Sequence, residues 1–161
     1  MAHGYGVRSG QLEQAKEEID QALTISRSVG DVFSQSFSLT FAVLFKNWEG
    51  LYDAALPLLS EGVMIAREHH LLVPLIYGCF RYGITLTGKG AYDEALATME
   101  EGLALAEKAG DVFTRLRLLN SLGWLYFELG DLERALDFNS RSAEGARERR
   151  DPEITANAYR P

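Results

Sequence analysis

The sequence predicts an all-α fold in which antiparallel helix pairs stack into a superhelical solenoid. Three observations indicate this fold: a glycine that recurs every 40 residues, small residues at fixed offsets behind it, and apolar residues at helical spacing in between. No stretch alternates apolar and polar residues between hairpin turns, as strands would. We therefore expect about four repeats of 40 residues, forming one domain over residues 1–161.

The period is visible in three columns of small residues. The glycine column consists of Gly10, Gly50, Gly90 and Gly130. The columns five and twelve positions further on consist of Ala15, Ala55, Ala95 and Ala135, and of Ala22, Gly62, Gly102 and Ser142. Because a repeat unit buries its apolar face only against its neighbours, such columns indicate where helices touch.

Each period is long enough for two helices of about 18 residues joined by short turns. The predicted helices cover residues 12–28, 32–48, 52–69, 72–88, 92–109, 112–129 and 132–149, with helical segments at 1–9 and 153–161. The first helix of a pair is the more apolar one, and the second has a polar face; Asp131 is a suitable N-cap for the last of them. Pro57 is expected to bend its helix or delay its start. Since the end helices are incomplete and lack a polar capping repeat, we expect this chain to be a piece of a longer protein.

Composition restricts the possible partners and compartments. Lys and Arg number 16 against 23 Asp and Glu, and the net charge of −7 argues against nucleic acid, which requires a cationic face. The single cysteine, Cys79, excludes an intrachain disulfide and is typical of a small buried apolar side chain in a reducing compartment, so we expect a cytoplasmic location. No apolar run reaches the length of a membrane span, and we expect no membrane partner.

Two stretches of the chain resemble the tetratricopeptide repeat in the spacing of their small and aromatic residues. They are Leu122-Gly123, Tyr126, Gly130-Asp131, Ala135 and Ser142, and Tyr82-Gly83, Leu86, Gly90, Tyr92, Ala95 and Gly102. The period of 40 exceeds the family's usual value of about 34 and is similar to the repeats of large bacterial regulators of the maltose-regulator type. Val43 and His3 depart from the pattern, because they stand where other repeats have the packing glycine.

The resemblance implies a noncatalytic scaffold for a protein or peptide partner, within a larger bacterial regulatory or signalling protein. A second interpretation stays open, in which the chain is the small-effector-sensing domain of a transcriptional regulator. The apolar faces at the two ends of the solenoid also predict self-association.

No catalytic, cofactor or metal site is predicted. The segment from Gly83 to Lys89 has the spacing of a phosphate-binding loop, but Gly90 replaces the hydroxyl residue and the segment is predicted to be helical. His69 and His70 are adjacent on a helix and so point about 100° apart, which does not suit a shared metal ion. We expect both to be exposed near the end of that helix.

In the resembled family the first helix of each pair lines the concave face, which implies a set of partner-binding residues. Carried onto this chain, the set consists of Phe37, Leu44, Asn47, Trp48, Tyr77, Phe80, Ile84, Arg117, Asn120, Trp124 and Phe127, with Thr40, Thr87 and Glu128 beside them. This apolar and aromatic surface suits an extended peptide or a helix better than a strongly charged tail. Core packing remains an alternative for the aromatic residues, whereas polar residues on an apolar helix are costly unless they face water or a partner.

Overall fold

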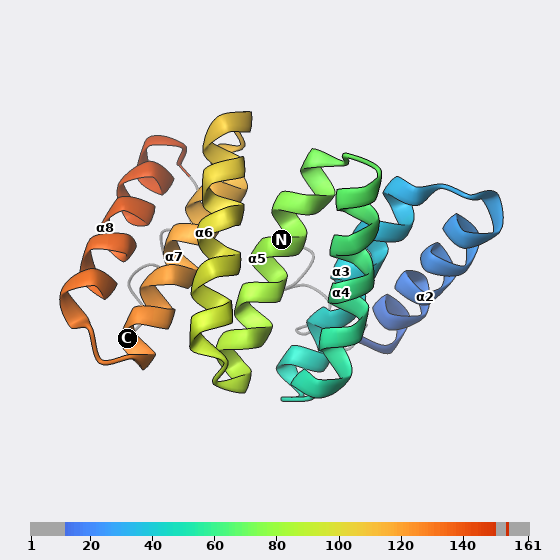
Figure 1. The fold of residues 1–161 in the computed structure, drawn as a ribbon, viewed down its shortest axis with the longest axis horizontal. Helices are drawn as coiled ribbons and strands as arrows, with labels where there is room; N and C mark the ends of the chain where they lie inside the picture. Colours follow the sequence, from blue (N-terminus) through green and yellow to red (C-terminus); the bar gives the residue numbers. More distant parts are fainter. Residues whose placement is uncertain (1–11, 151–153, 155–161) are drawn as a thin grey trace. The chain divides into compact units, whose positions relative to one another are not determined.

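The computed structural model describes residues 12–150 and Ile154, and this part of the chain consists of α-helices joined by short turns (Figure 1). The helices are α2 (Leu12–Val29), α3 (Val32–Trp48), α4 (Tyr52–Glu68), α5 (Leu72–Lys89), α6 (Tyr92–Ala109), α7 (Val112–Glu128) and α8 (Leu132–Glu148). Their bounds agree within one residue with the predicted ranges, and no strand occurs among the described residues, so the predicted all-α class is confirmed. The predicted segments 1–9 and 153–161 lie outside the described residues, except for Ile154.

Each helix is followed by a residue with left-handed backbone, so that two helices with their two turns make up one 40-residue period. These residues stand 20 positions apart: Gly30, Gly50, His70, Gly90, Gly110, Gly130 and Arg150, with φ between 53° and 83°. Left-handed φ is strained for an L-residue and unstrained for glycine, which explains five glycines in seven places. The residue after each glycine then bonds back to the helix, as Asp31 N donates to the carbonyl of Ser26 at 2.9 Å.

Three of the helices begin with an aspartate cap. The side chains of Asp31, Asp111 and Asp131 accept the backbone N–H three residues on, at 3.1, 3.0 and 3.1 Å, which confirms the cap predicted at Asp131. The Ser34 hydroxyl also donates to Asp31 at 2.6 Å and holds the pKa of that carboxyl below its usual value. Helix α4 begins at Tyr52 although it contains Pro57, so the predicted delay of its start is wrong. Pro57 lies in the second turn, where it removes one backbone donor and leaves the first turn intact.

The described residues divide into two compact units, the first ending at Pro74. In this unit α2 packs on α3 and α3 packs on α4. Gly62 permits the closest approach, because a Cβ there would lie 3.1 Å from the backbone oxygen of Ser36. The Ser36 hydroxyl donates to the carbonyl of Gly62 at 2.7 Å. The single domain over residues 1–161 stays a prediction.

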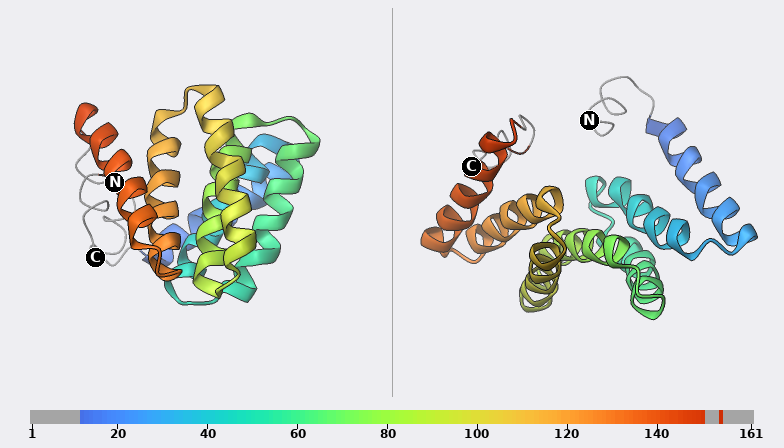
Figure 2. Two further views of the ribbon diagram at one scale, coloured as in Figure 1. Left: turned by 60° about the vertical axis from the view of Figure 1, so that its left-hand side comes forward. Right: turned by 90° about the horizontal axis from the view of Figure 1, so that it is seen from above.

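The second unit begins at Leu75 and contains most of α5 together with α6, α7 and α8. Helix α6 packs on α7 and α7 packs on α8, each antiparallel to the next (Figure 2). The hydroxyl bridge of the first unit recurs 80 positions later with donor and acceptor exchanged between the helices, since Ser142 donates to the carbonyl of Leu116 at 2.9 Å. The core of this unit includes Leu116, Leu119, Ala146 and Ile154, with Leu103, Val112 and Phe138 packed against them. Cys79 is fully buried, as predicted.

Candidate partner-binding site

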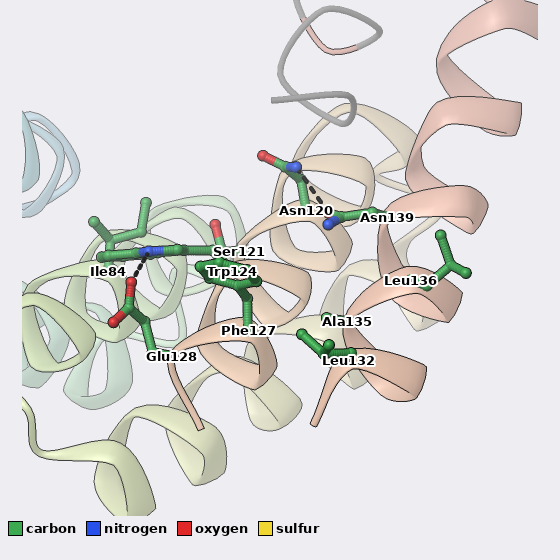
Figure 3. Close-up of a pocket in the computed structure, with 10 residues that line it drawn as sticks. All are labelled: Ile84, Asn120, Ser121, Trp124, Phe127, Glu128, Leu132, Ala135, Leu136 and Asn139. Carbon is green, nitrogen blue, oxygen red and sulfur yellow. Dashed lines mark hydrogen bonds between the residues drawn. The ribbon is translucent and has the colours of Figure 1, made fainter. Parts of the chain in front are cut away.

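A pocket of about 530 Å³ opens in the second unit between α5, α7 and α8, and we call it the α7–α8 pocket (Figure 3). Its lining consists of Ile84 from α5, of Asn120, Ser121, Trp124, Phe127 and Glu128 from α7, and of Leu132, Ala135, Leu136 and Asn139 from α8. Four large apolar side chains in this lining are exposed: Trp124 (38%), Phe127 (52%), Leu132 (63%) and Leu136 (70%). A concave cluster of exposed apolar side chains is typical of a binding site.

Two hydrogen bonds orient the polar groups of the pocket, and both are drawn in Figure 3. The Asn120 side-chain nitrogen donates to the Asn139 side-chain oxygen at 3.1 Å, which links α7 to α8. The Trp124 indole nitrogen donates to the Glu128 carboxylate at 2.9 Å, which fixes the indole against its own helix. An amide has two donors and an acceptor, so the asparagine pair keeps hydrogen-bonding capacity for a ligand.

The asparagine pair stands where the preceding helix pair has an apolar contact. A Cβ added to Gly83 on α5 would overlap the side chain of Met99 on α6, and Met99 is fully buried. Forty positions later a Cβ added to Gly123 on α7 would overlap the side chain of Asn139 on α8. The close approach of the two helices is therefore repeated, while the side chain that fills it changes from a thioether to an amide. The contact between α7 and α8 therefore contains an amide where the contact between α5 and α6 contains a thioether.

Four of the predicted partner-binding residues meet in this pocket: Ile84, Asn120, Trp124 and Phe127. Glu128, named beside them, lies in the same lining. Leu44 and Phe80 are 6% and 4% exposed, and Thr40 and Thr87 are also buried, so these four offer a partner almost no surface. For the aromatic Phe80, this burial corresponds to the core-packing alternative that the sequence left open.

The other predicted residues lie in separate places. Phe37 lines a recess of about 330 Å³ in the first unit, together with Ile25, Val29 and Phe33. In the same unit Trp48 is exposed and meets Phe45 edge-on at 5.6 Å, and Asn47 is half-buried. In the second unit the Tyr77 hydroxyl accepts a hydrogen bond from Arg81 at 2.6 Å, and the Arg117 guanidinium lies 4.5 Å from the ring centre of Phe113. Partner binding by these residues stays a prediction.

The α8 wall of the pocket, which consists of Leu132, Ala135, Leu136 and Asn139, is not among the partner-binding residues that the sequence predicts. Ser121 was also missed. One feature of the sequence indicates the site: Asn139 interrupts a column that holds Leu59 and Met99 in earlier repeats.

The arrangement provides an apolar surface and two amides that a ligand could contact. Across residues 12–150 and Ile154, no three His, Cys, Asp or Glu side chains gather as a metal site would require. The stretch from Gly83 to Lys89 is part of helix α5, so its phosphate-loop spacing does not form a loop. His69 and His70 are exposed at the end of α4, as predicted. In the described part of the chain, no helix combines the length and apolarity needed to cross a membrane.

Consecutive antiparallel helix pairs that present an apolar pocket define the class of helical-repeat binding modules. Residues 73–148, which include α6, α7, α8 and all but the first residue of α5, match the family model described as tetratricopeptide repeat. The match covers this part of the chain, and the resemblance to the tetratricopeptide repeat seen in the small-residue columns is confirmed to that extent. No curated protein matches the sequence.

Proposed function

We propose that the chain is a noncatalytic interaction scaffold that binds a segment of a partner protein in the α7–α8 pocket. The observation that supports this most directly is the exposed cluster of Trp124, Phe127, Leu132 and Leu136 beside an amide pair. The match of residues 73–148 to the tetratricopeptide repeat family model supports a protein-interaction role. The long period supports a place within a larger bacterial regulatory or signalling protein.

The chemistry of the pocket favours a protein segment as the ligand. Burying a large apolar side chain contributes about 1.5–3 kcal/mol, so the exposed residues can supply binding energy once a partner covers them. Aromatic side chains that a partner buries dominate the binding energy of many interfaces, and Trp124 in the lining of the pocket can serve as such an anchor. The amides of Asn120 and Asn139 can pair with a peptide bond or a polar side chain of the partner.

A small effector is a second candidate ligand. The pocket volume of about 530 Å³ lies within the range of about 300–1,000 Å³ that small-molecule sites occupy. In this alternative the asparagine pair would orient a metabolite, and the chain would sense that effector for a transcriptional regulator.

Selection from a random peptide library displayed on phage tests the proposal. Selected peptides are titrated against the wild type, Leu136→Asp and Met64→Asp by fluorescence anisotropy. Met64 is a matched control, because it is 52% exposed on α4 in the first unit. We expect Leu136→Asp to weaken binding at least about tenfold, since it places a charge in the apolar wall, and Met64→Asp to leave binding unchanged.

Two outcomes contradict the proposal. In the first, selected peptides bind the wild type and Leu136→Asp equally well. In the second, no peptide is selected, while scanning fluorimetry against a metabolite panel gives a thermal shift that Asn139→Ala abolishes. The second result would favour the effector alternative.

A further inference from the structure

A second recess in the first unit is bordered by α2, α3 and α4 and has a volume of about 290 Å³; we call it the α2–α3 recess. Its lining combines an apolar part with a charged part. The apolar part consists of Ile19, Leu23, Ala42, Phe45 and Leu58, and the charged part consists of Lys16, Asp20, Lys46 and Glu49. Apolar surface beside a few charged groups is typical of a site for a small molecule.

The corresponding place in the second unit is filled by larger apolar side chains. Three pairs of residues, eighty positions apart, show the difference: Ala42 and Leu122, Lys46 and Tyr126, and Leu58 and Phe138. Leu122 and Tyr126 are 0% and 7% exposed, and the ring of Tyr126 stacks on that of Phe138 with 5.4 Å between their centres. The α2–α3 recess therefore lies where the first unit has smaller or charged side chains.

Two of the four charged groups of the recess are paired with each other. Lys16 Nζ lies 3.0 Å from the Glu49 carboxylate and 5.8 Å from the ring centre of Phe45. Lys46 on α3 is half-buried, and its ammonium group forms no hydrogen bond or ion pair with a described residue. The carboxylate of Asp20 on α2 likewise forms none within the described chain. The recess thus presents one cation and one anion that a ligand can neutralise, and burying either charge without such a partner is costly.

The shape and charge of the lining restrict the chemistry of the ligand. A volume of about 290 Å³ lies just below the range of about 300–1,000 Å³ that drug-sized ligands occupy, so the ligand is small. Apolar groups such as Ile19 and Leu23 require an apolar body, while Lys46 requires an anion and Asp20 a cation. A residue inside a peptide carries neither backbone charge, whereas a free amino acid carries both.

We propose that the α2–α3 recess binds a free α-amino acid with an apolar side chain. Its carboxylate pairs with Lys46, its ammonium group pairs with Asp20, and its side chain fills the space beside Ala42. This site is independent of the α7–α8 pocket, because every residue of its lining belongs to the first unit. Failure of this inference would leave the proposed function untouched.

Isothermal titration calorimetry on the full chain tests the inference with L-leucine, L-isoleucine, L-methionine and L-phenylalanine. Isocaproate is L-leucine without its ammonium group, and isoamylamine is L-leucine without its carboxylate. Two variants change the recess: Lys46→Gln removes the cation, and Ala42→Leu introduces the side chain that the second unit has at Leu122. Lys108→Gln is the matched control, because Lys108 is exposed near the end of α6 in the second unit. Circular dichroism checks that each variant is folded.

We expect at least one of the four amino acids to bind saturably, with equal affinity for the wild type and Lys108→Gln. Lys46→Gln should weaken this binding at least about tenfold, because it removes a charge-assisted hydrogen bond. Ala42→Leu should abolish it, since the larger side chain takes the space of the ligand. Isocaproate and isoamylamine should each bind at least about tenfold more weakly than L-leucine, because each lacks one charged group.

Three results would overturn the inference. If none of the four amino acids binds, the recess is not an amino-acid site. If folded Ala42→Leu binds as tightly as the wild type, the ligand lies elsewhere. If isocaproate binds as tightly as L-leucine, the site recognises a simple carboxylate and Asp20 has no part in it. Should Ala42→Leu fail to fold, unchanged affinity of Lys46→Gln would contradict the inference by itself.

Discussion

Two contacts in the second unit, 40 positions apart, occupy the same place in the repeat and behave differently. In the first, Gly83 lies against Met99, and the side chain is fully buried. In the second, Gly123 lies against Asn139, which is half-buried and bonded to Asn120. The backbone approach is alike, so the side chain decides whether the contact belongs to the core or to a pocket.

The comparison shows how a repeat fold can present a pocket without changing its framework. A thioether at this place fills irregular space and excludes water. An amide at the same place requires hydrogen-bond partners, and its half-open surroundings allow water or a ligand to supply them. The pocket therefore lies where one repeat departs from the chemistry of its predecessor.

The largest difference in stability is expected when the side chains of Met99 and Asn139 are each truncated to alanine. Met99→Ala should lower the free energy of unfolding by about 2–4 kcal/mol, because it creates a cavity in the core. Asn139→Ala should cost about 1 kcal/mol, roughly the value of one hydrogen bond. Urea denaturation measures both. If Asn139→Ala lowered the free energy of unfolding as much as Met99→Ala does, Asn139 would be a core residue.

Enlarging the facing glycines should give a smaller difference. Gly83→Ala should destabilise the fold by about 1–2 kcal/mol, because Met99 has no free space to move into and the better helix propensity of alanine offsets only part of the clash. Gly123→Ala should change stability by less than about 0.5 kcal/mol, since Asn139 can turn into the pocket and alanine favours the helix. Thermal unfolding of the two variants measures this difference in stability. Equal destabilisation by Gly83→Ala and Gly123→Ala would contradict the prediction.

The smallest effect is the coupling between the two asparagines. A double-mutant cycle of Asn120→Ala and Asn139→Ala should give an interaction energy of about 0.5–1 kcal/mol, as expected for one hydrogen bond between half-buried amides. Asn120→Ala combined with Met64→Asp is the control, and these two changes should be additive because they lie in different units. A coupling of zero between the asparagines would show that water has replaced their hydrogen bond.

Much of the fold could be predicted from the sequence, because its causes are local. The turns require left-handed backbone, and glycine at Gly50, Gly90 and Gly130 reveals that requirement directly. An aspartate cap at Asp131 and the apolar face of residues 112–129 depend only on neighbours along one helix. Helix bounds were consequently predicted within one residue.

The candidate site was predicted only in part, because its cause is not local. Trp124 and Phe127 look alike in sequence to Leu44 and Phe80, yet the former pair is exposed and the latter pair is buried. Which of them faces a cavity depends on whether another helix covers the position. Leu132 and Leu136 of the α8 wall were not predicted for the same reason, because an apolar face on an outer helix is usually covered by a neighbouring helix. Asn139 was the one residue whose chemistry indicated otherwise.

The two tryptophans of the chain provide the most direct test of the pocket as the binding site. Trp124 lies in the α7–α8 pocket, whereas Trp48 is exposed in the first unit and serves as an internal control. Their indole N–H signals are resolved by ¹H–¹⁵N nuclear magnetic resonance, assigned with Trp48→Phe, and followed during titration with a peptide selected from the phage library. We predict that the Trp124 signal shifts progressively to saturation while the Trp48 signal stays fixed. A shift of Trp48 alone, or saturable binding that leaves Trp124 unmoved, would contradict the account.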